Sequence, residues 1–171
     1  NNFDDFFQEI KTFIKQKNFT EAKNQLENFL TDNSQEVKAI SLYLESLIGL
    51  NEINSTDEFL NSLDNEILKN NEIKKIKKRL VLIKQKNEGP SIDELSEMLN
   101  KSPKDIDIIF KIADNYFANT EFNNSFEILL KHYPKNKEKV KLKILNYFDV
   151  LGFEHDSTIL FRKKLSSIMF S

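Results

Sequence analysis

One apolar stripe, repeated along the chain, restricts this sequence to a helical fold. Near the start, apolar residues recur at spacings of three, four and seven, which is the periodicity of one face of an α-helix. A stripe with the same spacings returns 103 residues later. The first comprises Phe3, Phe6, Phe7, Ile10, Phe13 and Ile14, and the second comprises Ile106, Ile109, Phe110, Ala113, Tyr116 and Phe117.

Two further copies of the stripe fill the interval between these segments. A shift of 34 residues gives Val37, Ile40, Leu44, Leu47 and Ile48, and a further 36 gives Ile73, Ile76, Leu80 and Ile83. Each stripe is followed by a second amphipathic segment, so we expect the helices to occur in pairs. The expected second helices cover residues 19–31, 55–69, 91–100 and 121–133.

A period near 34 residues is the length of a tetratricopeptide repeat, a pair of helices that buries its apolar face by stacking on its neighbours. We therefore predict an all-α fold, a tetratricopeptide-like solenoid of helical hairpins with about ten helices. It is expected to be a single domain, 1–171, with repeats over about 3–31, 37–69, 73–100 and 106–133 and a closing helix pair over 137–170. The alternative is an irregular helical bundle in which the spacing is coincidental.

Composition excludes several kinds of functional site. The chain has no Cys, which excludes disulfides, thiolate metal sites and a Cys nucleophile. Its three Gly form neither of the Gly-rich motifs that hold phosphates. His132 and His155 lack metal-ligand neighbours, and His132 at a predicted helix end fits a C-terminal capping cation. We therefore predict no catalytic residue, no metal, no cofactor and a protein that is not an enzyme.

Charge is nearly balanced over the whole chain but concentrated in one predicted helix. The net charge is −2 and no apolar run spans a membrane, so we expect neither a membrane nor a nucleic acid as partner. Residues 69–86 nevertheless carry eight basic side chains and one acidic. This basic patch, with Lys74, Lys75, Lys77, Lys78 and Arg79 at its centre, is interpreted as the solvated face of a helix. The alternative is a weak binder of RNA or an anionic surface through Lys74–Lys86.

The C-terminal segment combines apolar residues with three consecutive cations. A terminal repeat usually turns a polar face to water, whereas this chain ends on Met169 and Phe170. The segment either packs back onto the preceding helix or presents one side to a partner. The candidate partner contacts are Phe161, Arg162, Lys163, Lys164, Leu165, Ile168, Met169 and Phe170.

From about Ser102 to Ser171 the chain resembles a known family, the thioredoxin-like co-chaperones called YbbN or CnoX (chaperedoxins), in their C-terminal tetratricopeptide region. The resemblance is carried by Asp107–Ala118, by Glu121–Leu130, by Phe148 with Leu151 and Gly152, and by the ending Arg162–Ser171. The ending is the most specific part. The thioredoxin domain is missing from this chain, and the family's tryptophan-containing segment is replaced by Pro134–Lys137.

The resemblance implies a non-catalytic protein-binding module of a bacterial cytoplasmic co-chaperone. Its partners would be unfolded or oxidation-damaged client proteins, the GroEL chaperonin and the DnaK system. Clients would lie in an apolar groove lined by first-helix side chains, with the C-terminal helix docking on the chaperonin. A second hypothesis is a tetratricopeptide scaffold that tethers a protein complex without holding clients.

Overall fold

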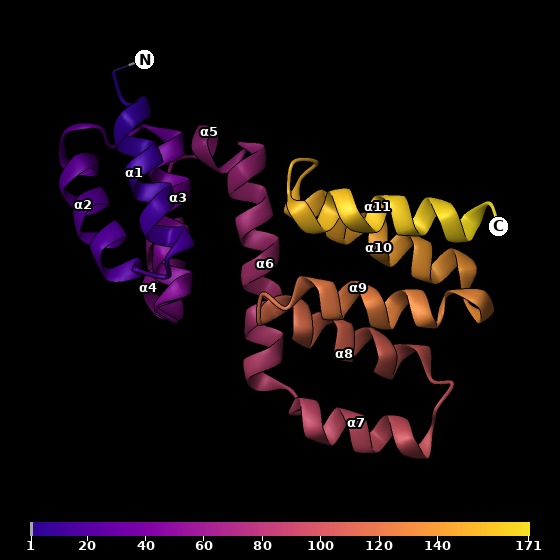
Figure 1. Cartoon of the computed structure of the whole chain (residues 1–171). Coiled ribbons are helices and arrows are strands. Elements are labelled where there is room, and N and C mark those ends of the chain that lie inside the picture. Colours follow the sequence, from indigo (N-terminus) through magenta and orange to yellow (C-terminus); the bar gives the residue numbers. More distant parts are fainter. Residues whose placement is uncertain (1) are drawn as a thin grey trace. The chain divides into compact units, whose positions relative to one another are not determined.

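The computed structural model describes residues 2–171, and these form eleven α-helices and one short 3₁₀ helix with no β-strand (Figure 1). The predicted all-α fold is confirmed. The helices group into two compact units, and the boundary lies within a helix, between Lys77 and Lys78. We call them unit 1, which ends at Lys77, and unit 2, Lys78–Ser171. The single domain and its repeat limits stay predictions.

Unit 1 is built around an aromatic core formed by its first three helices. Its helices are α1 (Asp4–Lys15), α2 (Phe19–Asp32), α3 (Val37–Gly49), α4 (Ile53–Ser62), α5 (Asn65–Leu68) and the first part of α6 (Asn71–Glu88). Phe7 and Ile10 of the predicted stripe are buried, and Phe6 stacks on Phe29 with 4.7 Å between ring centroids. The stripe therefore faces the core, as its periodicity predicts.

The segment expected to form one helix over 55–69 is divided in two. Helix α4 stops at Ser62 because Leu63 adopts an extended conformation, with ψ at 144°. Asp64 then starts α5, since its carboxylate accepts a hydrogen bond from the Ile67 amide at 3.3 Å. An aspartate in this position satisfies an amide that a new helix would otherwise leave unpaired. The apolar periodicity continues through the break, which is why the pattern alone predicts a single helix.

Helices α2 and α3 approach closely where Gly49 meets the ring of Phe19. A Cβ atom on Gly49 would lie 2.5 Å from the nearest ring carbons of Phe19. We therefore expect Gly49→Ala to lower the free energy of unfolding by about 1 kcal/mol, because overpacking outweighs the better helix propensity of alanine. Urea denaturation followed by circular dichroism measures the change.

A double-mutant cycle isolates this contact. In a Phe19→Ala background the obstruction is gone, so Gly49→Ala is expected to become stabilising by up to about 1 kcal/mol. An equal loss of stability in both backgrounds would show that the ring of Phe19 is not the cause.

Unit 2 places its last four helices side by side (Figure 1). Its helices are the second part of α6, then α7 (Ile92–Lys101), α8 (Ile106–Ala118), α9 (Phe122–Lys131), the 3₁₀ helix η1 (Tyr133–Lys135), α10 (Lys137–Leu151) and α11 (Asp156–Met169). Phe126 of α9 lies at the centre of the core and is fully buried. Its ring stacks on Phe161 of α11 at 4.8 Å between centroids and contacts Phe148 of α10 at 5.2 Å. One aromatic side chain thus joins three helices.

Three turns within helical hairpins share one backbone structure. Lys17, Asn51 and Thr120 adopt the left-handed conformation with φ between 58° and 62°. In the first, the amides of Lys17 and Asn18 donate to the carbonyls of Ile14 and Phe13, and the same pattern follows α3 and α8. These are the paired hydrogen bonds of a Schellman motif. Lys17 and Asn51 are 34 residues apart, and Lys17 and Thr120 are 103 apart, so the turns keep the period of the stripes.

The third expected pair differs from these hairpins. Helix α6 continues to Glu88 without a left-handed turn, and α7 packs on α8. Helix α7 begins at a capping box, in which the Ser91 hydroxyl oxygen accepts from the Glu94 amide and the Ser91 amide donates to the Glu94 carboxylate. The Ser-x-x-Glu spacing of residues 91–94 is the sequence signature of such a box. Helices α6 and α7 are therefore not joined by the left-handed turn that the other three hairpins share.

Candidate protein-binding surface

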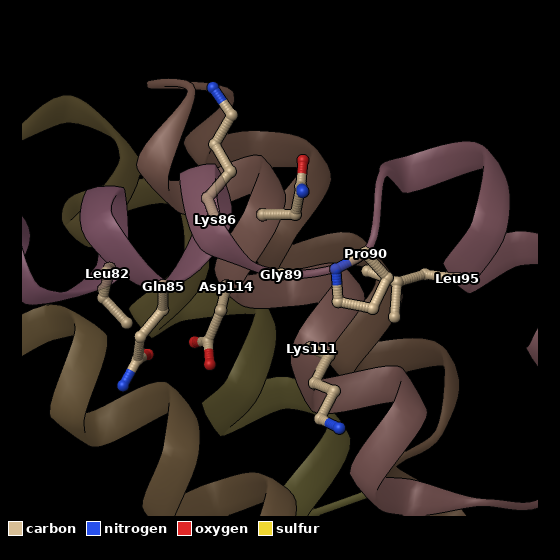
Figure 2. Close-up of a pocket in the computed structure, with 9 residues that line it drawn as sticks. Leu82, Gln85, Lys86, Gly89, Pro90, Leu95, Lys111 and Asp114 are labelled. Atoms are coloured by element: carbon tan, nitrogen blue, oxygen red, sulfur yellow. The ribbon is translucent and has the colours of Figure 1, made fainter.

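A pocket of about 410 Å³ lies where the second part of α6, the turn at Gly89 and Pro90, α7 and α8 meet. Its walls combine apolar, amide and charged side chains: Leu82, Gln85, Lys86, Leu95, Lys111, Asp114 and Asn115. In Figure 2 the side chains of Gln85 and Asp114 point the same way, whereas Lys86 extends to the other side of α6. Lys86 forms a hydrogen bond with Asn119 at the end of α8. The pocket is therefore lined by a mixture of apolar and polar side chains.

Asp114 joins this pocket to the next hairpin. Its Oδ1 atom accepts a hydrogen bond from the Tyr147 hydroxyl at 2.5 Å and lies 2.7 Å from Nζ of Lys143. Burial, together with the Asp114 carboxylate, raises the pKa of Tyr147, so this hydroxyl stays protonated and donates. The Lys143 ammonium also lies over the rings of Phe110 and Tyr147. The charged pair thus fixes α10 against α8.

The C-terminal helix α11 divides the predicted partner contacts into two groups. Phe161 (1% exposed) and Leu165 (4%) belong to the core of unit 2, where Phe161 stacks on Phe126. The prediction that Phe161 and Leu165 contact a partner is wrong, because a partner does not reach buried side chains. Arg162, Lys163 and Phe170 are exposed, and Ile168 and Met169 are half-buried. Lys164 is exposed but pairs with Glu127 at 2.6 Å.

The basic patch lies along α6 with its apolar face turned inward. Ile73, Ile76, Leu80 and Ile83 are buried, as the periodicity predicts. Lys74 and Lys77 are exposed, Lys75 pairs with Glu72, and Lys78 pairs with Asp149 at 3.2 Å. Arg79 is half-buried and has an interaction partner. The lysines and the arginine of this patch therefore form the outer face of an amphipathic helix.

Apolar side chains are exposed in unit 2 and not in unit 1, over the part of the chain that the structure describes. Six of the eight belong to the last hairpin: Leu142, Leu145, Phe153, Ile159, Leu160 and Phe170; the other two are Val81 and Met98. Leu142 is 61% exposed and Phe170 83%. A group of exposed apolar side chains on one hairpin is typical of an interaction surface.

Residues 2–171 contain no group of three or more His, Asp or Glu side chains placed to hold a metal ion. None of their helices has the length and apolar character needed to cross a membrane.

His132 is the residue that follows the last turn of α9, and burial, together with the charges of Lys131 and Lys135, lowers its pKa. The lowered pKa disfavours the imidazolium form that a capping cation requires, although His132 does stand at the predicted C-cap position of α9.

A sequence model of the family described as tetratricopeptide repeat matches residues 85–170, half of the chain. The chain belongs to the tetratricopeptide repeat family. This agrees with the predicted solenoid of helical hairpins. No curated protein matches the chain. Among solved structures, the crystal structure of a domain of unknown function from Vibrio parahaemolyticus is 18% identical, with a TM-score of 0.44, covering 94% of this chain and 96% of that one.

Tetratricopeptide repeats mediate protein–protein interactions and are typically non-catalytic, so this chain is a protein-interaction scaffold. The sequence-based site prediction missed Leu142 and Leu145 of the tetratricopeptide helix α10. Their signal is present in the sequence, because both lie opposite the buried stripe of Val140, Ile144 and Tyr147 on a helical wheel. The pocket beside Asp114 has no such signal, since it depends on how α6, α7 and α8 meet.

Proposed function

We propose that this chain is the client-binding and chaperone-docking module of a thioredoxin-like co-chaperone. The exposed apolar side chains of the last hairpin support this proposal most directly. We call Leu142, Leu145, Phe153, Ile159, Leu160 and Phe170 the client surface. An unfolding protein presents apolar segments of no fixed sequence, and a surface that buries them without shape selectivity slows their aggregation.

The exposed end of α11 is proposed as the docking segment for GroEL and the DnaK system. Arg162 and Lys163 supply charge there, while Met169 and Phe170 supply apolar surface. Phe161 and Leu165 hold the helix in the core, so that these four side chains keep a defined orientation. A partner would then contact the outer face of α11 without unfolding the hairpin.

Light scattering by heat-denatured citrate synthase tests the client-holding activity. We expect the chain to suppress aggregation near equimolar ratio and the double variant Leu142→Gln/Leu145→Gln to need about tenfold more protein, because two exposed leucines contribute at least about 1.4 kcal/mol when buried. The matched control, Val81→Gln/Met98→Gln, removes two exposed apolar side chains outside the client surface. It is expected to act like the unaltered chain.

The outcomes separate client holding from tethering of a complex. A chain that leaves the scattering unchanged at stoichiometric ratio is not a holdase. Pull-down from a lysate of heat-treated cells then distinguishes the two functions, since a holdase retains a heterogeneous set of denatured proteins and a tether retains one constant partner. Binding of purified GroEL, compared between the unaltered chain and Arg162→Gln/Lys163→Gln, tests the docking segment separately, because neither residue belongs to the client surface.

A further inference from the structure

The last hairpin, α10 and α11, has an outer face that nothing covers in the described part of the chain. Both helices lie beside α9 (Figure 1), where Phe148 of α10 and Phe161 of α11 contact the ring of Phe126. Their buried faces therefore turn toward α9, and their opposite faces turn away from it. Four exposed apolar side chains lie on these opposite faces: Leu142 and Leu145 of α10, Ile159 of α11, and Phe170 directly after α11. Because stacked hairpins bury such faces against a neighbour, this one is a stacking surface without its neighbour.

These four side chains are arranged symmetrically about one level of the hairpin. On α10, Leu142 and Leu145 lie nine and six residues before the last residue of the helix, so their midpoint is about eight residues from the turn. On α11, Ile159 and Phe170 lie three and fourteen residues after the first residue of the helix, so their midpoint has the same level. Eight residues of α-helix span about 12 Å. A two-fold axis at this level exchanges the two members of each pair.

We propose that two copies of this chain form a two-fold symmetric dimer through the outer faces of their last hairpins. Helix α10 lies antiparallel on α10 of the second copy, so that Leu142 contacts Leu145. Helix α11 lies antiparallel on α11 of the second copy, so that Ile159 contacts Phe170. In such an isologous interface each contact occurs twice. The shared level of the two midpoints favours a second copy, because an unrelated partner requires no symmetry of this face.

The charged side chains of the outer face are compatible with this pairing. The same symmetry places Lys163 opposite Ser166 of the second copy, so the ammonium group faces a hydroxyl and not another cation. It also places Glu138 opposite Asp149, whose charge is compensated within its own chain by Lys78 at 3.2 Å. The pairing therefore buries apolar side chains without setting uncompensated like charges against each other.

The size of the outer face fits a reversible dimer. Helix α10 has 15 residues and α11 has 14, so each is about 21 Å long, and the two together are about 20 Å wide. The face thus measures roughly 400 Å² in projection, and its accessible surface is larger, which approaches the about 800 Å² per partner of a standard interface. We therefore expect a dissociation constant in the micromolar range.

Sedimentation equilibrium of the full chain tests the dimer. The unaltered chain is expected to reach twice the mass of one chain as its concentration rises through the micromolar range. The variant Leu142→Gln/Leu145→Gln is expected to raise the dissociation constant about a hundredfold, because each dimer loses four leucines that contribute at least about threefold each. Val81→Gln/Met98→Gln removes two exposed apolar side chains outside the hairpin and is expected to dimerise like the unaltered chain. Circular dichroism checks that both variants are folded.

Cysteine cross-linking tests the register, since the chain has no cysteine of its own. A mixture of Ile159→Cys and Phe170→Cys chains is expected to form an intermolecular disulfide on mild oxidation. Neither variant alone is expected to do so, because each residue lies about 16 Å along the helix from its own copy, too far for a disulfide. The control mixture, Phe153→Cys with Phe170→Cys, also joins two exposed positions of the hairpin and is expected to remain uncross-linked.

Three results would overturn the proposal. The first is a chain that is still monomeric at about 1 mM, where an interface of this size associates; the outer face then belongs to a different protein. The second is equal weakening by the leucine variant and its control. The third is cross-linking of the control mixture but not of the Ile159→Cys and Phe170→Cys mixture, which would assign the dimer another register.

The dimer goes beyond the proposed function, and the two fail separately. It covers four of the six side chains of the client surface, so a client that binds there displaces the second copy; this consequence rests on the proposed function. Sedimentation is measured without a client, so a dimer that does not suppress aggregation removes only the client-holding proposal. A monomer that suppresses aggregation removes only the dimer.

Discussion

Replacing Phe126 with alanine is expected to lower the free energy of unfolding of unit 2 by about 3–5 kcal/mol. The ring is fully buried and contacts aromatic side chains on two other helices, Phe161 and Phe148. Its removal leaves a cavity between three helices. The cavity closes only if α9, α10 and α11 all move. Hydrogen exchange read by mass spectrometry resolves the effect along the chain, and amides of α8 to α11 are expected to lose protection by this amount.

Phe170→Ala is the matched control for that measurement. It removes the same side chain from the last hairpin, but the ring of Phe170 is 83% exposed. Its effect on the free energy of unfolding is expected to stay within about 0.5 kcal/mol. If Phe126→Ala costs less than 1 kcal/mol, or about as little as Phe170→Ala, Phe126 is not the centre of the core.

Replacing Asp114 with alanine is expected to lower the free energy of unfolding by about 2–3 kcal/mol. The substitution leaves the Tyr147 hydroxyl, on a side chain only 3% exposed, without its acceptor. It also removes the counterion of Lys143. An unsatisfied buried hydroxyl costs about 1–3 kcal/mol, and the loss of a partly buried ion pair adds to this. Urea denaturation measures the change.

Two further variants separate the hydrogen bond from the ion pair. Asp114→Asn keeps an oxygen that accepts from Tyr147 but removes the charge, so we expect it to cost about half as much as Asp114→Ala. In a Tyr147→Phe background, Asp114→Ala is expected to cost less by about 1 kcal/mol, because the hydroxyl that it leaves unsatisfied is already gone. Strict additivity of the two substitutions would contradict the coupling.

The sequence predicts the fold well because the apolar stripes have a period that only helices satisfy. Phe7, Ile40, Ile73 and Ile109 come from the four stripes, and all four are buried. The break at Leu63 was not predicted, since it depends on a capping aspartate and not on the apolar pattern. The departure at α6 and α7 was not predicted either, because the stripe persists where the turn that closes the other hairpins is absent.

The candidate sites were less predictable than the fold. For α11 the sequence indicates an amphipathic segment, but the direction of each side chain depends on the helices that pack against it. Phe161 and Leu165 therefore turned out to be core residues, while Phe170 is exposed. The pocket beside Asp114 forms between segments far apart in the sequence, such as those of Gln85 and Asp114. No local pattern contains the information that brings such residues together.

Substitutions at the three Schellman turns can change the stability of unit 1 and of unit 2 separately. At each turn a residue other than glycine adopts the left-handed backbone conformation. This conformation costs such a residue about 1 kcal/mol or more, whereas glycine adopts it freely. Lys17 and Asn51 lie in unit 1 and Thr120, a β-branched residue, lies in unit 2. Glycine at the first two positions would strengthen one unit, and glycine at the third would strengthen the other. Substitutions that relieve backbone strain, without changing any packing contact, therefore determine which unit unfolds first on heating.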